Sequence, residues 1–557
     1  YASGLSRVVV ATGTDGSGDP SRLVVKPGVY PIEVQLRSAS QSLDRLTTYL
    51  IALRPAVDGP RLGLAVVVPL GGTDEPASRT DGTSALTTET SRSIVETATV
   101  LGAHPAVPVT LLAAPEHLAA LTDPAARQQL LDVAKGREVA PSTFVPVDEQ
   151  AWLAAGIGDD LSSQLDLGQA MLSATLGAPP QDTWVSEGPM AASAATWLAG
   201  RGVRSVVVPD TTLTALDARR FNTTLTQPFV LDGVPGMRAT TADSALARHL
   251  GETGDPVLDA SRLLADLAIL DLDRPKATRM AVFEVPRTAT PAMVEAVLTG
   301  VEATRTLQPA TLGQLLARVP TAGAAGQTDG SGTPLTRGLT TSSAASLGEF
   351  PGRLRAARDD VASYRGTLDP GDLRADALDH LALAAGHRGL GRDAQLERLD
   401  AVRSAVAGEL HKVEAPSRQT ITFTARDGVV SVSLRNTTGH PVHVVLRLEG
   451  PRLELPAHPD GVVPLTLAGN EETTRAQIDV RARSSGDAAL DVTIETPDGR
   501  IVLGRTRITV RSTAFSGVGV VLSAGSLAFL LLWWAKHTVG ARRGRRRRSG
   551  RGDAGQK

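Results

Sequence analysis

The sequence predicts a multidomain chain with α/β and all-β parts. These are an Ig-like β-sandwich fragment, a central (β/α) barrel-like domain, a helical hairpin, a C-terminal Ig-like sandwich and a single transmembrane helix. Three observations predict this fold class. In the middle of the chain, continuous apolar runs alternate with helical periods, as parallel strands with crossover helices do. On either side, short runs alternate apolar and polar residues between turn residues, as half-buried antiparallel strands do. Near the C-terminus, an uncharged apolar run precedes an arginine cluster.

Composition excludes several classes of function. The 557 residues suggest three or four domains. The formal net charge is −2, but nine Lys or Arg and one Asp lie from Lys536 onward, which leaves about −10 on the preceding residues. Because this larger part is acidic, we do not expect nucleic acid as a partner. With no cysteine, the chain has no disulfide, no cysteine nucleophile and no thiolate metal site.

Residues 1–57 predict a β-rich, Ig-like segment. Apolar and polar residues alternate in VYPIEVQLR, residues 29–37, and residues 46–53 form a second run after turn residues. The chain begins with Tyr, and strand-like residues follow it almost at once. We therefore expect further strands and a signal segment upstream.

Residues 61–320 predict the (β/α) barrel-like domain. The expected strands are residues 62–70, 107–115, 138–148, 182–188, 204–210 and 280–286. Pro, Asp or Gly ends or follows each strand, at the end where loops build the functional site in barrels and open sheets alike. The pattern leaves open whether the barrel closes.

Three further parts precede the apolar run. A linker rich in Gly, Ser and Thr covers residues 321–346. A helical segment covers residues 347–415, where Leu and Val recur at three- and four-residue steps. An Ig-like sandwich covers residues 418–512, where alternating runs are separated by turns every 8 to 12 residues or so.

The uncharged run at residues 514–535 predicts the transmembrane helix. At about 1.5 Å per residue, it is just long enough for a hydrocarbon core of roughly 30 Å. Phe515 lies near its start, and Trp533 and Trp534 lie at its end, where indole rings prefer the headgroup layer. A buried core helix is the alternative.

The basic tail at residues 536–557 sets the predicted orientation. Arg545 and Arg546 belong to an arginine cluster that the positive-inside rule places in the cytoplasm, near anionic lipids. We therefore predict a single-pass protein of the cell membrane, with an extracytoplasmic N-terminal region, a cytoplasmic tail and the lipid bilayer as a partner.

Glu187 is the candidate catalytic residue. It follows a predicted strand in TWVSEG and precedes a helical period, so its carboxylate is expected at the C-terminal end of the barrel strands. Asp148, Asp210 or Glu284 would partner it in sugar chemistry as nucleophile or general acid. Trp184 would stack on a sugar ring. The alternatives are a solvated loop glutamate and a core tryptophan.

The sequence predicts no metal site and no cofactor. Asp74 and Glu75 follow the first central strand, but His104 and His117 do not have the i, i+4 spacing of a helical metal site. The motif TDGSG occurs twice without the later bidentate Glu of a calcium loop, and we interpret both copies as turns or linkers. No glycine-rich phosphate loop lies between a strand and a helix, and no GxSxG elbow occurs.

A family resemblance is visible in the order of these parts and in the basic tail. It is also visible in two stretches of sequence, PGVYPIEVQL and TWVSEGPMAASAATWLAGRGVRSVVVPD. The chain resembles the uncharacterised actinobacterial membrane-anchored cell-envelope proteins encoded near the lipid II flippase. Its central domain is similar in layout to the barrels of polysaccharide deacetylases and related glycosidases. It departs from the deacetylase pattern by lacking the aspartate pair and the paired histidines. The resemblance implies a role near peptidoglycan or arabinogalactan assembly.

These observations predict a membrane-anchored extracytoplasmic protein that binds or scaffolds cell-wall components without catalysis. Cell-wall glycan and envelope-assembly membrane proteins are the expected partners. The alternative is a glycan hydrolase or deacetylase that uses carboxylates at the strand ends, so whether the chain is an enzyme stays open. Two carboxylates about 5 to 10 Å apart in a cleft would favour hydrolysis.

Overall fold

The structure is a computed structural model. It describes residues 12–13, 23–24, 26–38, 41–52, 60–72, 76–177, 179–214, 226–273, 278–305, 307–322, 336–340, 343–469, 473–513 and 517–544. The chain divides into two compact units. The first comprises Tyr1–Ala357 and Ala377–Val402, and the second comprises Arg358–Asp376 and Arg403–Lys557.

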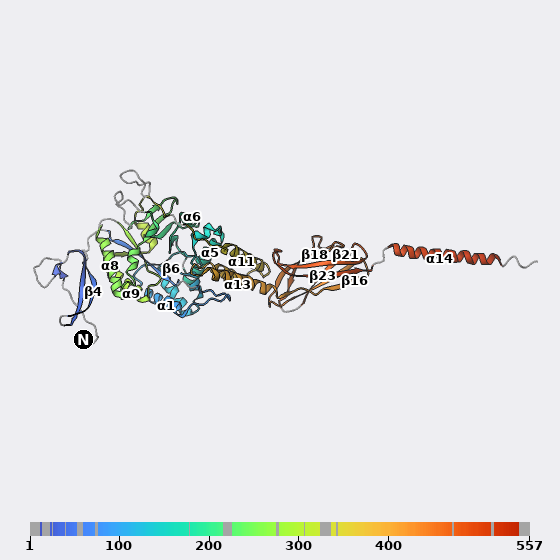
Figure 1. The fold of residues 1–557 in the computed structure, drawn as a ribbon, viewed down its shortest axis with the longest axis horizontal. Coiled ribbons are helices and arrows are strands. Elements are labelled where there is room, and N and C mark those ends of the chain that lie inside the picture. The colour runs from blue at the N-terminus through green and yellow to red at the C-terminus, as the bar shows by residue number, and fades with distance from the viewer. Residues whose placement is uncertain are drawn as a thin grey trace, which may run out of the picture. The chain divides into compact units, whose positions relative to one another are not determined.

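A curled parallel sheet forms the centre of the first unit (Figure 1). Its parallel strands run in the order β8, β9, β11, β12, β5, β6, β7. Their bounds are β5 Leu62–Leu70, β6 Val109–Ala113, β7 Glu138–Val139, β8 Thr183–Val185, β9 Ser205–Pro209, β11 Arg238–Ala242 and β12 Met280–Glu284. The two end strands approach each other, because Gln181 N, just before β8, donates to Val139 O of β7 at 2.9 Å. No strand pairing joins β7 to β8 among the described residues, so the predicted barrel-like domain is a curled half-barrel.

Three further strands extend this sheet. Strand β13 (Leu307–Pro309) pairs with β5 in parallel. Strand β10 (Phe229–Leu231) pairs antiparallel with β11, and β14 (Thr336–Arg337) continues from β10.

Strands such as β5 and β9 are almost entirely apolar because both of their faces are covered. Alternate residues of β5 such as Leu64 and Val66 pack outward with Ile94 of α1, Leu263 of α8 and Val297 of α9. The residues between them face inward and pack with the inner residues of neighbouring strands. The covering helices are α1 Thr88–Ala103, α8 Pro256–Asp273 and α9 Pro291–Ala303 (Figure 1).

The remaining helices connect or flank the strands. They are α2 Pro115–Ala120, α3 Pro124–Ala134, α4 Glu149–Ala154, α5 Gly158–Leu176, α6 Ala192–Gly200, α7 Ser244–Arg248, α10 Leu312–Arg318, α11 Phe350–Arg365, α12 Arg374–Ala384, α13 Arg392–Leu410 and a short 3-10 turn, η1, at Asp210–Thr212. The helices α11, α12 and α13 contribute residues to both units.

The sheet differs from the sequence expectation in one shortened strand and in four strands that were not expected, β10, β11, β13 and β14. The run at 138–148 pairs only over β7, because Pro141 and Pro146 have no N–H to donate to a neighbouring strand. The rest of this run is irregular. Strand β11 was missed because its residues, RATTA, contain no continuous apolar run.

The described part of the N-terminal segment is a hairpin. Strands β3 (Gly28–Ser38) and β4 (Gln41–Ala52) pair antiparallel, with Gly28 opposite Ala52. A separate parallel pair joins β1 (Thr12–Gly13) to β2 (Leu23–Val24). Thr48 Oγ1 lies 3.3 Å from Ser261 Oγ of α8, so the hairpin contacts the half-barrel unit to which it belongs.

The second unit contains a two-sheet β-sandwich. One sheet has the order β15, β17, β21, β19, and the other has the order β16, β23, β22, β18, β20. The bounds are β15 Val413–Glu414, β16 Gln419–Phe423, β17 Asp427–Asn436, β18 Val442–Glu449, β19 Leu453–Glu454, β20 Val462–Leu467, β21 Thr473–Ala482, β22 Gly486–Glu495 and β23 Val502–Ser512. Alternate residues are buried along β17, β18 and β21, as expected for strands with one face on a core.

The C-terminal helix α14 (Gly517–Gly544) corrects the predicted fold class. Among the described residues, no helix combines the length and the apolar side chains that crossing a bilayer requires. The predictions of a single transmembrane helix and of a single-pass cell-membrane localisation are therefore wrong.

Of the residues predicted to lie at a membrane, Trp533 and Trp534 are on α14 and exposed. The Trp533 ring stacks on the His537 ring, with 4.8 Å between the ring centroids. Phe515, Arg545 and Arg546 lie outside the described residues.

Candidate pocket at the carboxyl ends of the strands

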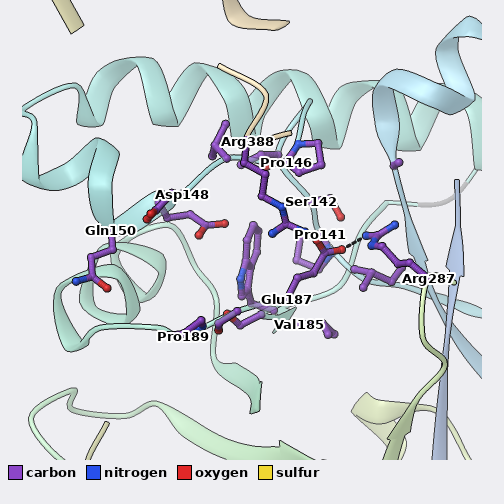
Figure 2. Close-up of a pocket in the computed structure, with 18 of the residues that line it drawn as sticks. Pro141, Ser142, Pro146, Asp148, Gln150, Val185, Glu187, Pro189, Arg287 and Arg388 are labelled. Carbon is purple, nitrogen blue, oxygen red and sulfur yellow. Dashed lines mark hydrogen bonds and ion pairs between the residues drawn. The ribbon is translucent and has the colours of Figure 1, made fainter. Parts of the chain in front are cut away.

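A cavity of about 310 Å³ lies at the carboxyl ends of β6, β7 and β8 (Figure 2). Most of its wall comes from residues that directly follow these strands, and Arg287, Arg388 and residues 343–345 complete it. All of these residues belong to the first unit. The wall combines prolines and Trp184 with charged and hydroxyl side chains.

Glu187 is one of the charged residues that line this pocket. Val185, at the end of β8, packs into the inner core with Val67 and Val207, so the residue two positions later emerges on the same side. The Glu187 carboxylate forms two ion pairs, through Oε1 with Arg287 and through Oε2 with Arg388. Its side chain is 16% exposed. Figure 2 shows the two arginines approaching it from different sides. Both carboxylate oxygens therefore have a guanidinium partner.

Arg287 follows β12 and is fixed by the turn after β5. Its Nη1 donates to Gly71 O at 2.8 Å. The neighbouring Gly72 has a φ of +87°, and a Cβ added there would overlap the Arg287 guanidinium. A glycine at this position allows both the backbone conformation and the close approach of the arginine.

Arg388 reaches the pocket from the segment between α12 and α13. Its backbone N donates to Pro146 O at 2.8 Å, which ties this segment to the irregular chain after β7. A second tie lies nearby, where Gln164 Nε2 of α5 donates to Leu383 O at 2.7 Å. The arginine is thus placed by main-chain contacts as well as by its ion pair.

Two further carboxyl groups lie close enough to Arg388 for its positive charge to act on their pKa values. Burial raises the pKa of Glu149, a partly buried residue in the pocket wall, to about 7, although the positive charge of Arg388 opposes the shift. Burial likewise raises the pKa of Glu284, at the end of β12, to about 7, again against the charge of Arg388. Near neutral pH, both carboxyl groups are partly protonated.

The structure brings together three of the five predicted site residues, whereas Asp210 and Glu284 are not in the pocket wall. Glu187, Asp148 and Trp184 all line the pocket. Asp148 is also the N-cap of α4, because its Oδ1 accepts from Ala151 N at 2.9 Å. Trp184 is 4% exposed and belongs to a buried apolar cluster, so only part of its ring can reach a ligand. Asp210 is not in the pocket wall; its Oδ2 accepts from Ser244 Oγ at 3.0 Å.

Sequence reasoning missed Arg287, Arg388 and Glu149. Arg287 and Glu149 had a usable signal, because each follows a predicted strand within a few residues. Arg388 had none, because it is 201 positions from Glu187 and belongs to a segment that was assigned to helices.

The residues considered for a metal are used in other ways. Among the described residues, no group of three or more His, Asp or Glu side chains is arranged to hold a metal ion. His117 Nδ1 accepts from Gly72 N at 3.0 Å. Asp74 and Glu75 lie outside the described residues.

His104 has two carboxylate partners instead. Its Nδ1 lies 2.8 Å from Glu302 Oε2, and its Nε2 lies 3.2 Å from Glu295 Oε1, both on α9. Burial favours the neutral ring, but hydrogen bonds and charges from the two glutamates outweigh burial, and the pKa of His104 is raised.

The fold and the pocket define a protein with a curled β/α half-barrel and a charged pocket at the carboxyl ends of its strands. The chain belongs to a family of unknown function, DUF6049, whose model matches residues 19–533. This confirms only that the chain belongs to an uncharacterised family; the actinobacterial origin, the cell-envelope role and the flippase neighbourhood stay predictions. No curated protein matches the chain.

Several solved structures are similar to the chain at low identity. The α-amylase AmyC from Thermotoga maritima is 9% identical, with a TM-score of 0.41, over 63% of this chain and 93% of that one. A GH57-type branching enzyme from Pyrococcus horikoshii is 11% identical, with a TM-score of 0.40, over 63% and 88%. A putative polysaccharide deacetylase from Mycobacterium smegmatis is 14% identical, with a TM-score of 0.31, over 48% and 93%. At these scores the likeness carries no argument about activity.

Proposed function

We propose that the pocket binds a glycan and that the chain acts by binding rather than by catalysis. The observation that carries this proposal is the position of Glu187, a strand-end carboxylate held by Arg287 and Arg388 in a pocket. The pocket volume of about 310 Å³ is at the lower end of the range for ligand sites, and it favours a short glycan segment.

The chemistry of the wall suits sugar hydroxyls. Each hydroxyl both donates and accepts hydrogen bonds. Arg287 and Arg388 supply donors, and Glu187 and Asp148 supply acceptors, all as planar groups with fixed directions. The exposed part of Trp184 and the neighbouring prolines offer apolar surface for the C–H faces of a ring.

The ion pairs of Glu187 argue against catalysis. A glycosidase needs one carboxylate that is free to attack the sugar or to activate water, and a second, protonated carboxyl group that donates to the leaving group. Both oxygens of Glu187 are instead bound by guanidinium groups, which lower its capacity to act as a nucleophile or base.

One observation favours hydrolysis as a second candidate function. Glu149 has a pKa raised to about 7, as a general acid requires, and it shares the pocket with Glu187. In this mechanism Glu187 would leave its arginines to act as nucleophile or base.

Binding and turnover of oligosaccharides by the full chain would test both candidates. Fragments of cell-wall glycan are the first ligands to try, because the sequence resemblance points to envelope assembly. We expect a saturable binding signal with no change in glycan mass. Glu187→Gln should change the affinity, whereas the control Glu96→Gln, on the exposed side of α1, should not. Hydrolysis that is lost in Glu187→Gln would establish the second candidate, and absence of binding would refute the first.

A further inference from the structure

We propose that the glycan bound in this pocket carries a carboxylate, which Arg287 and Arg388 receive in place of the carboxylate of Glu187. Glu187 is then an internal competitor that fills the anion position while the pocket is empty. The inference rests on the proposed glycan-binding function and names the chemical class of its ligand.

Contacts that do not involve Glu187 help to position both arginines. Arg287 Nη1 donates to Gly71 O at 2.8 Å, and Gly72 leaves room for its guanidinium. For Arg388 the contact is a main-chain one, since its backbone N donates to Pro146 O at 2.8 Å. The guanidinium of Arg287 and the main chain that carries Arg388 therefore have contacts that do not depend on Glu187.

The structure also defines which anion fits. One oxygen of the Glu187 carboxylate pairs with Arg287 and the other with Arg388, so the space between the guanidinium groups has the size and shape of a carboxylate. A uronic acid presents the same group on a sugar ring. A neutral sugar presents only hydroxyls, which cannot replace the charge that Glu187 supplies.

Glu187 and its arginines lie next to solvent. Glu187 belongs to the short segment between β8 and α6, and the position of a Cβ on the next residue, Gly188, has no atom within 4 Å. The side chain of Arg388 is 39% exposed, so a ligand can reach it from solvent. Leaving the arginines lets Glu187 regain its hydration.

The charge balance of the pocket allows this exchange. Glu149 and Glu284, which also lie in the field of Arg388, are partly neutral near pH 7. They therefore compete weakly with a ligand carboxylate for the positive charge of the arginines. Replacing one carboxylate by another leaves the number of charges between the arginines unchanged.

Calorimetric titration of the full chain with methyl glucuronide and methyl glucoside tests the inference, because these probes differ only in the C6 carboxylate. We expect wild type to bind the glucuronide at least about tenfold more tightly than the glucoside. Glu187→Gln should bind the glucuronide more tightly again, by about tenfold, because the internal competitor is gone. Arg388→Gln and Arg287→Gln should lose the preference, whereas the control Arg204→Gln, at an arginine 78% exposed, should keep it. Circular dichroism verifies that each variant is folded.

Each other outcome has a defined meaning. Equal affinity for the two sugars, or weaker glucuronide binding by Glu187→Gln, would overturn the acidic-ligand inference and leave glycan binding standing. Inorganic phosphate that displaces the glucuronide at similar concentration would overturn it in favour of a general anion site. If neither sugar binds to wild type or to Glu187→Gln, both the inference and the proposed function fail.

Discussion

Replacing Gly386 by Ala should destabilise the half-barrel unit through a single contact. Gly386 is buried and lies two residues before Arg388. A Cβ added to it would overlap the six-membered ring of Trp152. That ring cannot move aside easily, because Trp152 is 2% exposed and its ring centroid lies 5.8 Å from that of Phe350.

The expected loss of stability in Gly386→Ala comes from packing. The φ of Gly386 lies outside the left-handed region, so alanine itself introduces no backbone strain there. Inserting a methyl group into a filled core costs about 1–3 kcal/mol. A larger protein loses roughly 2–4 °C in Tm for each kcal/mol, so we expect Gly386→Ala to lower the first unfolding transition by several degrees. Arg388 should shift as well, because the same short segment carries it.

Urea and thermal unfolding of the full chain, followed by circular dichroism, measure this effect. Gly391→Ala is the matched control, because Gly391 lies in the same segment and a Cβ there meets no atom within 4 Å. In a Trp152→Phe background, where the ring is smaller, Gly386→Ala should cost less than in wild type. Equal effects at the two glycines, or additive effects of Gly386→Ala and Trp152→Phe, would refute the reasoning.

Three more predictions concern charged groups. Because the pKa of His104 is raised in the fold, His104 should add its full contribution to the unfolding free energy below about pH 6.5. That contribution should be lost as pH rises through the folded pKa, and His104→Gln should flatten this part of a stability–pH profile. Between about pH 4.5 and 7, stability should fall further because the raised pKa of Glu149 disfavours the folded state as the group ionises, and Glu149→Gln should remove that slope. Asp259, which is fully buried, accepts from Gly251 N at 2.9 Å and from Thr253 N and Oγ1 at 3.1 and 2.6 Å. Burial opposes ionisation of Asp259, but these hydrogen bonds hold its pKa below the usual range. Asp259→Asn should therefore cost about 1–3 kcal/mol at pH 7 in urea unfolding, and the difference from wild type should shrink as pH falls below about 4.

The sequence by itself determined the alternation of strands and helices in the central domain. Residues of β5, β9 and β12 are mostly apolar because both faces of a covered parallel sheet are buried, and that signal is local. It also predicted a position for Glu187 at the carboxyl edge of the sheet, where a residue just after a parallel strand must lie, and Glu187 lines the pocket there. A local signal was insufficient for β11, whose threonines and alanines show no apolar run.

The transmembrane prediction shows the limit of hydropathy over a fixed window. An uncharged run next to arginines satisfied the composition rule, but among the described residues no helix is long and apolar enough to cross a bilayer.

Only the tertiary structure decided which side chains contact Glu187. Its two partners come from the turn after β12 and from the segment before α13, and neither distance along the chain suggests the contact. The raised pKa of Glu149 has the same origin, because burial and the charge of Arg388 act through space. Hydrophobic periodicity can be recognised from residues that are neighbours in the sequence. The electrostatics of a pocket depend instead on which distant segments the fold brings within a few ångströms of each other.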